Sequence, residues 1–191
     1  GDTSAGIKEL EKALSLRPDN DPLKLRLARV YILNGQNDEA IKLLDEVLAK
    51  GDPDYIIRST KVLAYLQAKD IDKAASVTQQ MLDESGDNAR LLNLMANIKL
   101  AAADKAGARD YFNRALAVEK DNLVSLANLA RMDEQGGDLD AAESRYLKIL
   151  DQKPKNTLAM TSLARIARAR DDTQRQIKWL EAARQADENE V

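Results

Sequence analysis

The feature that most constrains this chain is a helical pattern that returns every 34 residues. The stretch GGDLDAAESRYLKIL at 136–150 repeats the pattern of GQNDEAIKLLDEVL at 35–48, and Ala142 matches Ala40. The separation of these two alanines, 102 residues, is three periods of 34. A fixed period of this length indicates a solenoid, because one helix pair cannot bury its apolar face alone and neighbouring pairs must stack.

Helix breakers divide the chain at the same interval. Only four Pro and eight Gly occur in 191 residues. The longer stops are RPDN (17–20), GDPD (51–54), SGDN (85–88), EKDN (119–122) and PKN (154–156). Between the stops, apolar residues follow the i, i+3, i+4, i+7 spacing of an amphipathic helix, and a shorter break halves each interval. We therefore predict an all-α chain of eleven helices.

The repeat boundaries follow from this register. Counting from Asp21, the blocks are 21–54, 55–88, 89–122, 123–156 and 157–191, and residues 1–20 fit the second helix of one more block. We expect these blocks, about five and a half repeats, to form one solenoid domain. Small residues recur at fixed block positions, and we expect Ala108 and Ala142 to lie where helices touch.

Composition limits the classes of function. The chain has no Cys, which excludes disulfides and thiolate metal sites, and no His, the commonest general acid–base side chain. It also lacks a phosphate-binding Gly-rich loop, a nucleophile elbow and a metal-ligand cluster. We therefore predict no enzyme, no cofactor and no metal. A net charge of −3 without a basic stripe argues against nucleic acid, and no apolar run is long enough to insert into a membrane.

The blocks resemble the tetratricopeptide repeat (TPR). Block 123–156 carries the family's pattern at Leu126, Leu129, Ala130, Ala142, Tyr146 and Pro154. Block 89–122 carries it at Leu92, Met95, Ala96, Ala108, Phe112 and Ala115. The resemblance covers the whole chain. It implies a right-handed superhelical solenoid that acts as a protein–protein interaction scaffold and binds a partner in a concave groove.

The same resemblance implies which residues meet the partner, because the first helix of each TPR lines the groove. The groove residues carried over are Arg29, Leu63, Asn93, Asn97, Asn128, Arg131, Arg165 and Arg168. The lining changes from apolar to amide to arginine, which predicts a protein or peptide ligand with an acidic segment. The carboxylate clamp of some TPR domains is not expected, since its cation positions hold Asn93, Leu158 and Ser162.

A narrower resemblance concerns the Ala- and Arg-rich stretch SLARIARARDDTQRQIKWLEAARQADENEV at 162–191. Its texture is similar to TPR lipoproteins of bacterial exosortase (PEP-CTERM) and exopolysaccharide systems. This resemblance implies a fragment of a longer bacterial protein, periplasmic or anchored to the outer membrane; without it, we expect a cytoplasmic protein. Leu10, Ile177 and Leu180 lack a neighbouring helix in the register, so we also expect end-to-end self-association.

Two alternatives stay open at this point. The segment could be a structural spacer in a longer solenoid with no ligand of its own, or an RNA-binding helical repeat, which the missing basic stripe disfavours. Within the fold, Lys99 and Asp133 hold the same place in adjacent blocks and are expected to pair. The partner, the total repeat number, the compartment and the oligomeric state are left undetermined.

Overall fold

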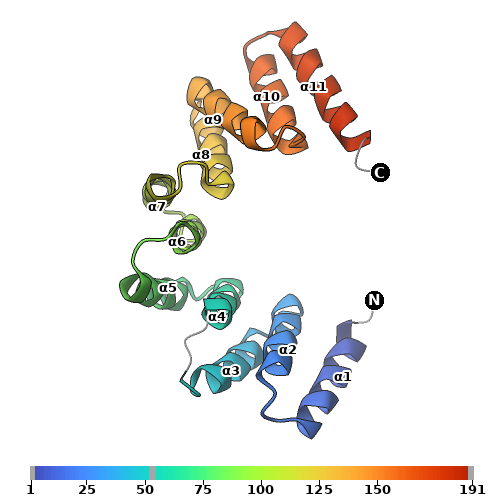
Figure 1. The fold of residues 1–191 in the computed structure, drawn as a ribbon, viewed down its shortest axis with the longest axis vertical. Helices are drawn as coiled ribbons and strands as arrows, with labels where there is room; N and C mark the ends of the chain where they lie inside the picture. Colours follow the sequence, from blue (N-terminus) through green and yellow to red (C-terminus); the bar gives the residue numbers. More distant parts are fainter. Residues whose placement is uncertain (1–2, 52–54, 189–191) are drawn as a thin grey trace. The chain divides into compact units, whose positions relative to one another are not determined.

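The computed structural model describes residues 3–51 and 55–188, and within these ranges the chain forms eleven α-helices and no strand (Figure 1). The helices are α1 Thr3–Leu16, α2 Asp21–Leu33, α3 Asn37–Leu48, α4 Tyr55–Gln67, α5 Ile71–Ser85, α6 Ala89–Ala101, α7 Lys105–Val118, α8 Leu123–Gly136, α9 Leu139–Gln152, α10 Thr157–Ala169 and α11 Thr173–Glu188. The predicted all-α helical-repeat solenoid is confirmed. Across the described ranges, no helix combines the length and apolar character needed to cross a membrane.

Asparagine caps explain where several first helices begin. The Asn20 side chain accepts a hydrogen bond from the Leu23 backbone N–H at 2.9 Å, and Asn122 and Asn156 cap α8 and α10 in the same way. An Asn at this place satisfies one of the N–H groups that the first helical turn leaves without a partner. The first helices start at residues 21, 55, 89, 123 and 157. The stop predicted at 51–54 lies mostly outside the described residues.

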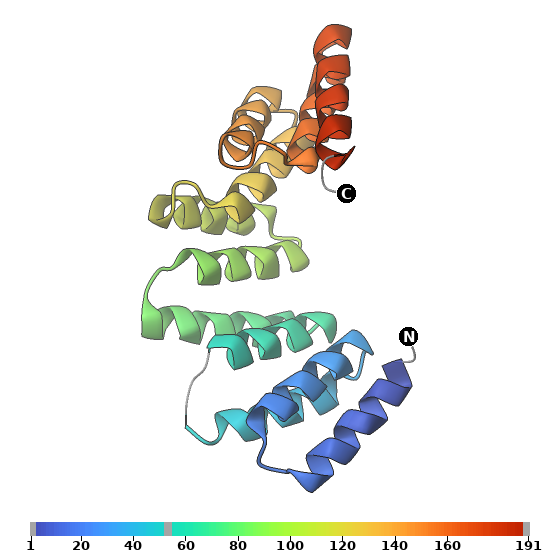
Figure 2. The same ribbon diagram turned by 45° about the vertical axis from the view of Figure 1, so that its right-hand side comes forward.

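The chain divides into two compact units. The first comprises residues 1–86 and 97–104, and the second comprises residues 87–96 and 105–191. Helix α6 therefore contributes its beginning to the second unit and its end to the first. In both units successive helices pack against their neighbours in the chain, as the two ribbon views show for α2 with α3 and for α10 with α11 (Figure 2).

The core of the first unit lies among α1 to α4, where Leu27, Ile32 and Leu44 are fully buried. The Tyr31 hydroxyl donates a hydrogen bond of 2.7 Å to Glu11, which joins α2 to α1. Burial, together with this hydrogen bond, raises the pKa of Tyr31 to about 12. The hydroxyl is therefore protonated and remains a donor to Glu11 at neutral pH.

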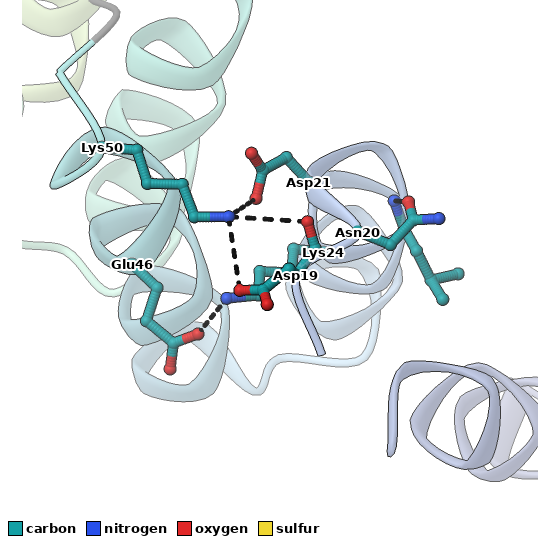
Figure 3. Close-up of polar contacts among 7 residues, drawn as sticks. Asp19, Asn20, Asp21, Lys24, Glu46 and Lys50 are labelled. Carbon is teal, nitrogen blue, oxygen red and sulfur yellow. Dashed lines mark hydrogen bonds and ion pairs between the residues drawn. The ribbon is translucent and has the colours of Figure 1, made fainter. Parts of the chain in front are cut away.

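Two lysines bind the beginning of α2 to the end of α3 (Figure 3). The Lys50 ammonium lies 2.7 Å from the carboxylate of Asp21 and 3.8 Å from that of Asp19. Lys24 is buried along its length and reaches Glu46 at 2.5 Å. These contacts turn both acidic residues of the 17–21 turn toward α3.

The core of the second unit is built from Phe112, Leu126, Leu129 and Leu163, all buried. Ala108 and Ala142 have no exposed surface, which fits the expectation that these small residues lie where helices touch. Trp179 of α11 packs against Met160 and Ala183. The last helix pair is therefore closed by apolar contacts, although Gln176 replaces the small residue found at its position in the other blocks.

The expected pair between Lys99 and Asp133 is wrong. Asp133 is only 3% exposed and accepts hydrogen bonds from Arg109 and Arg145, while Lys99 lies 3.5 Å from Asp104. A buried carboxylate is stable only when charged donors lie beside it. Arg109 of α7 and Arg145 of α9, the second helices on either side of α8, supply these donors. Asp133 therefore belongs to the packed interior of the second unit.

Candidate functional site

The eight predicted groove residues fall on five first helices. Arg29 on α2, Leu63 on α4 and Asn97 on α6 belong to the first unit, and all three side chains are exposed. The other five belong to the second unit: Asn93, Asn128, Arg131, Arg165 and Arg168. Asn97 and Asn128, predicted to hold a ligand backbone together, thus lie in different units.

Asn93 is not available to a ligand. It is 7% exposed, its amide donates to Asn122 Oδ1 at 2.9 Å, and its carbonyl oxygen accepts from Ser125 Oγ at 2.7 Å. Both ends of the side chain are therefore used between α6 and α8. Packing between neighbouring repeats, which the register alone does not describe, places this position inside the solenoid, and we leave Asn93 out of the candidate site.

The remaining four residues of the second unit lie on α8 and α10, and we call their surface, together with Glu134, the cationic face. Asn128 is half-buried and donates to the Val124 carbonyl at 2.9 Å, while its own oxygen accepts from Arg131 Nη2 at 2.7 Å. The Arg131 guanidinium is exposed, and among the residues that the structure describes it is bound to this neutral amide and to no carboxylate. Its charge is therefore oriented but not neutralised.

Arg165 is held by a carboxylate. Its Nε and Nη2 atoms donate to the two oxygens of Glu134 at 2.9 and 3.1 Å, and Nη2 also reaches Ser162 Oγ at 2.8 Å. Tyr146 donates a further hydrogen bond to Glu134 at 3.1 Å. The Arg165 hydrogen bonds lower the pKa of Glu134, so the pair is fully ionised at neutral pH. This two-pronged geometry is the strongest arrangement of an arginine and a carboxylate.

Arg168 lies one helical turn beyond Arg165 on α10 and is exposed. Within the described ranges, no acidic side chain is paired with it. The cationic face thus carries three arginines and one carboxylate, with Arg131 and Arg168 left in excess. Glu134 lies on the same first helix as Arg131, three residues further along, and its pairing with Arg165 of the next repeat was not predicted.

A search of residues 3–51 and 55–188 finds no group of three acidic, His or Cys side chains placed to hold a metal ion. The charged side chains of the cationic face are bound to one another or directed to solvent. This surface can therefore recognise the charge and hydrogen-bonding groups of a ligand.

Comparisons of this sequence with known proteins agree on one family. Two sequence models described as tetratricopeptide repeat match residues 1–56 and residues 127–191, together more than half of the chain. A curated relative, the antiviral innate immune response effector IFIT1 of Macaca fascicularis, is 30% identical over 166 residues, which is 76% of this chain and 35% of that protein. The uncharacterized protein ycf37 of Porphyra purpurea is 30% identical over 95 residues, 48% of this chain and 55% of that protein. The chain thus spans between about a third and just over half of these relatives.

Solved structures share the fold at low sequence identity. BtubC (BKLC) from P. vanneervenii superposes with a TM-score of 0.74 at 19% identity, covering 98% of this chain and 89% of that one. The MamA protein gives a TM-score of 0.67 at 17% identity, covering 88% and 92%. YrrB, described as a TPR protein with an unusual peptide-binding site, gives 0.60 at 14%, covering 93% and 91%. The 34-residue register, the eleven helices in the described residues and these matches agree that the chain belongs to the tetratricopeptide repeat family.

Proposed function

We propose that this chain is a protein-interaction scaffold whose cationic face binds an acidic segment of a protein or peptide partner. TPR repeats are interaction modules rather than catalysts, and the described residues present charged side chains without a reactive constellation. The observation that carries the proposal is the uncompensated charge of Arg131 and Arg168 on an exposed surface of α8 and α10. A carboxylate on the partner would supply the charged acceptors that both guanidinium groups lack.

The geometry assigns different roles to the three arginines. Arg165 is already saturated by Glu134, so it shapes the surface and offers little charge to a ligand. Arg131 and Arg168 lie to either side of that pair along their helices and supply the net attraction. The neighbour YrrB is described as having a peptide-binding site. This description supports the role of a peptide-binding scaffold, without bearing on the individual arginines.

The test begins with a pull-down using the protein, followed by mass spectrometry to identify the partner. The affinity of the identified partner is then measured for Arg131→Ala, Arg168→Ala and Lys148→Ala. Lys148 is an exposed cation on α9 and serves as the matched control. We expect each arginine variant to weaken binding about tenfold, the equivalent of one charge-assisted hydrogen bond, and the lysine variant to bind normally. Equal affinity for all three variants would favour a spacer without a ligand on this face.

We also propose a link to bacterial protein sorting or exopolysaccharide export, and end-to-end self-association. The link to bacterial protein sorting or exopolysaccharide export depends on the texture of residues 162–191, and partners identified from such a system would support it. End-to-end self-association is supported by the exposure of Ile177 and Leu180 on α11, whereas Leu10 is half-buried in the core. Sedimentation that shows a strict monomer at high concentration would contradict it.

A further inference from the structure

A groove lies between the second helices of two neighbouring repeats in the second unit. It has a volume of about 480 Å³ and opens between the end of α7 and α9. Both walls belong to complete repeats, 89–122 and 123–156. Leu126 is buried at the bottom of the groove, whereas Lys120 and Lys148 are exposed at its rim. The full lining combines apolar and cationic side chains: Leu116, Lys120, Leu126, Ala141, Ser144, Arg145 and Lys148.

One repeat later, a tryptophan fills the corresponding space. Trp179 of α11 is half-buried, and both Trp179 and Leu150 pack against the cluster that contains Met160. Leu150 and Met160 are the counterparts of Leu116 and Leu126, 34 residues further along the chain. The apolar surface that borders the α7–α9 groove therefore has an aromatic side chain packed on it in the next repeat.

The position that Trp179 holds is occupied by Arg145 in the α7–α9 groove. In the other complete repeats this position is apolar or aromatic: Leu43, Val77 and Tyr111. The Arg145 guanidinium is drawn to the carboxylate of Asp133, which is 3% exposed and needs a charged donor. Because the arginine is held there, the groove stays open where the next repeat inserts an indole ring.

The rim of the groove carries positive charge that no carboxylate neutralises. In the part of the chain that the structure describes, neither Lys120 nor Lys148 forms an ion pair. The acidic residues Asp140 and Glu143 of α9 are both bound to Arg170 instead. A ligand in the groove therefore meets an apolar bottom and a lysine rim, which suits an apolar group flanked by carboxylates.

We propose that the α7–α9 groove binds an acidic segment of a protein partner that inserts an aromatic side chain. The ring packs on Leu116, Leu126 and Ala141, as the Trp179 indole packs on the equivalent surface one repeat later. The carboxylates on either side of the ring pair with Lys120 and Lys148.

The cationic rim favours an aromatic side chain over an aliphatic one, because a cation is attracted to the face of an aromatic ring. The chain shows this contact within itself, where the Arg114 guanidinium lies 4.9 Å from the centre of the Tyr111 ring. The groove is separate from the cationic face, since its side chains come mainly from α7 and α9 and those of the cationic face come from α8 and α10. The two surfaces therefore take different partner segments.

The probe is a fluorescently labelled peptide with capped ends and the sequence Asp-Glu-Trp-Glu-Asp. One control peptide replaces the Trp with Ala, and the other replaces the acidic residues with Asn and Gln. Anisotropy is measured at about 0.15 M salt, where distant surface charges are screened. We expect each control to bind about tenfold more weakly, because burial of a large apolar side chain and a charge-assisted hydrogen bond are each worth at least about this factor. Equal binding by either control, or no binding of the probe at millimolar concentration, would overturn the proposal.

Protein variants locate the peptide. Lys120→Glu should weaken probe binding about tenfold, and Lys120→Arg should retain it. The matched control is Lys105→Glu, which changes an exposed lysine at the start of α7, outside the groove, and should bind normally. Arg145→Trp should abolish binding, because the new indole fills the groove as Trp179 fills the next one. Circular dichroism checks the fold of each variant, and unchanged binding by Lys120→Glu would by itself reject the groove.

Further measurements separate the groove from the cationic face. Arg131→Ala and Arg168→Ala should leave probe binding unchanged, whereas Lys148→Ala, which should not affect a partner on the cationic face, should weaken the probe several-fold. Loss of probe binding in the two arginine variants would place the peptide on the cationic face; this would reject the groove without contradicting the proposed function. Amide NMR shifts on titration should cluster at residues 116–120 and 141–148, and a cluster elsewhere would also reject the groove.

Discussion

The turns at residues 17–26 and 119–128, which we call the first and fourth joints, share one local structure but differ in how far their residues are buried. Both turns use an asparagine cap and the same backbone hydrogen bonds, so their local sequence builds the same shape. In the fourth joint, α6 covers the turn and Ser125 is fully buried; in the first joint, Leu16 is 77% exposed. Local sequence therefore builds the turn. Packing of a further helix on the turn decides whether its residues are buried or exposed.

The largest expected difference comes from exchanging the residues at the centre of the two joints. Ser125→Leu introduces two additional heavy atoms into a fully buried site and removes the hydrogen bond to Asn93. This should cost about 2–4 kcal/mol of the free energy of unfolding. The reverse change in the first joint, Leu23→Ser, removes a half-buried apolar side chain and should cost about 1 kcal/mol. Urea unfolding followed by circular dichroism measures both, and equal costs would show that the first joint is as well covered as the fourth.

A second pair of variants tests the helices that precede the two joints. Ala115 has no exposed surface, so Ala115→Leu overpacks the contact and should cost about 1–3 kcal/mol. Ala13, its counterpart, borders open space, and Ala13→Leu should change stability by less than about 0.5 kcal/mol. Thermal melts of the two variants give the comparison. A large loss in Ala13→Leu would mean that Ala13 lies in a tightly packed contact.

Acid tests the charged contacts of the second unit. Because the folded-state pKa of Glu134 is lowered, its contribution is present above the ordinary value of 4.5 and is lost as the pH falls through the folded-state pKa. We expect Glu134→Gln to be less stable than the native chain at pH 7 by less than about 1 kcal/mol, since Arg165 is partly exposed. This difference should shrink as the pH falls below 4.5. A constant difference in melting temperature across this range would contradict the assignment.

The smallest effect on stability is expected at the exposed end of α1. Leu16→Ser changes a side chain that is already exposed and should alter the free energy of unfolding by less than about 0.5 kcal/mol. A thermal melt of this variant checks this. A destabilised variant would show that Leu16 belongs to the core.

The 34-residue repeat pattern predicted the fold well because the features that define it are local in the sequence. The i, i+3, i+4 spacing and the breaks between helices led to eleven helices, and Asn20, Asn122 and Asn156 cap the helices that follow them. Small residues such as Ala108 and Ala142 could be assigned to contacts because their block positions repeat. Each of these properties depends on residues within one or two turns or on the period itself.

The side-chain partners were less predictable. Asn93 was expected at a ligand groove and instead binds Asn122 and Ser125. Asp133 was expected beside Lys99 and instead accepts from Arg109 and Arg145, and the pairing of Arg165 with Glu134 was not anticipated. These partners are 12 to 32 residues apart in the chain. Which of two plausible charges meets a carboxylate depends on side-chain direction at the helix contact.

By itself, the sequence determined the helices, their period and the chemistry available on each, because hydrogen bonding and apolar spacing within a helix are local. Only the tertiary structure decided that Asn93 is interior, that Glu134 neutralises Arg165, and that Leu23 remains half-buried while Ser125 is fully covered. Burial is a property of what stacks on a residue, and stacking is set by contacts between repeats that the pattern within one repeat does not specify.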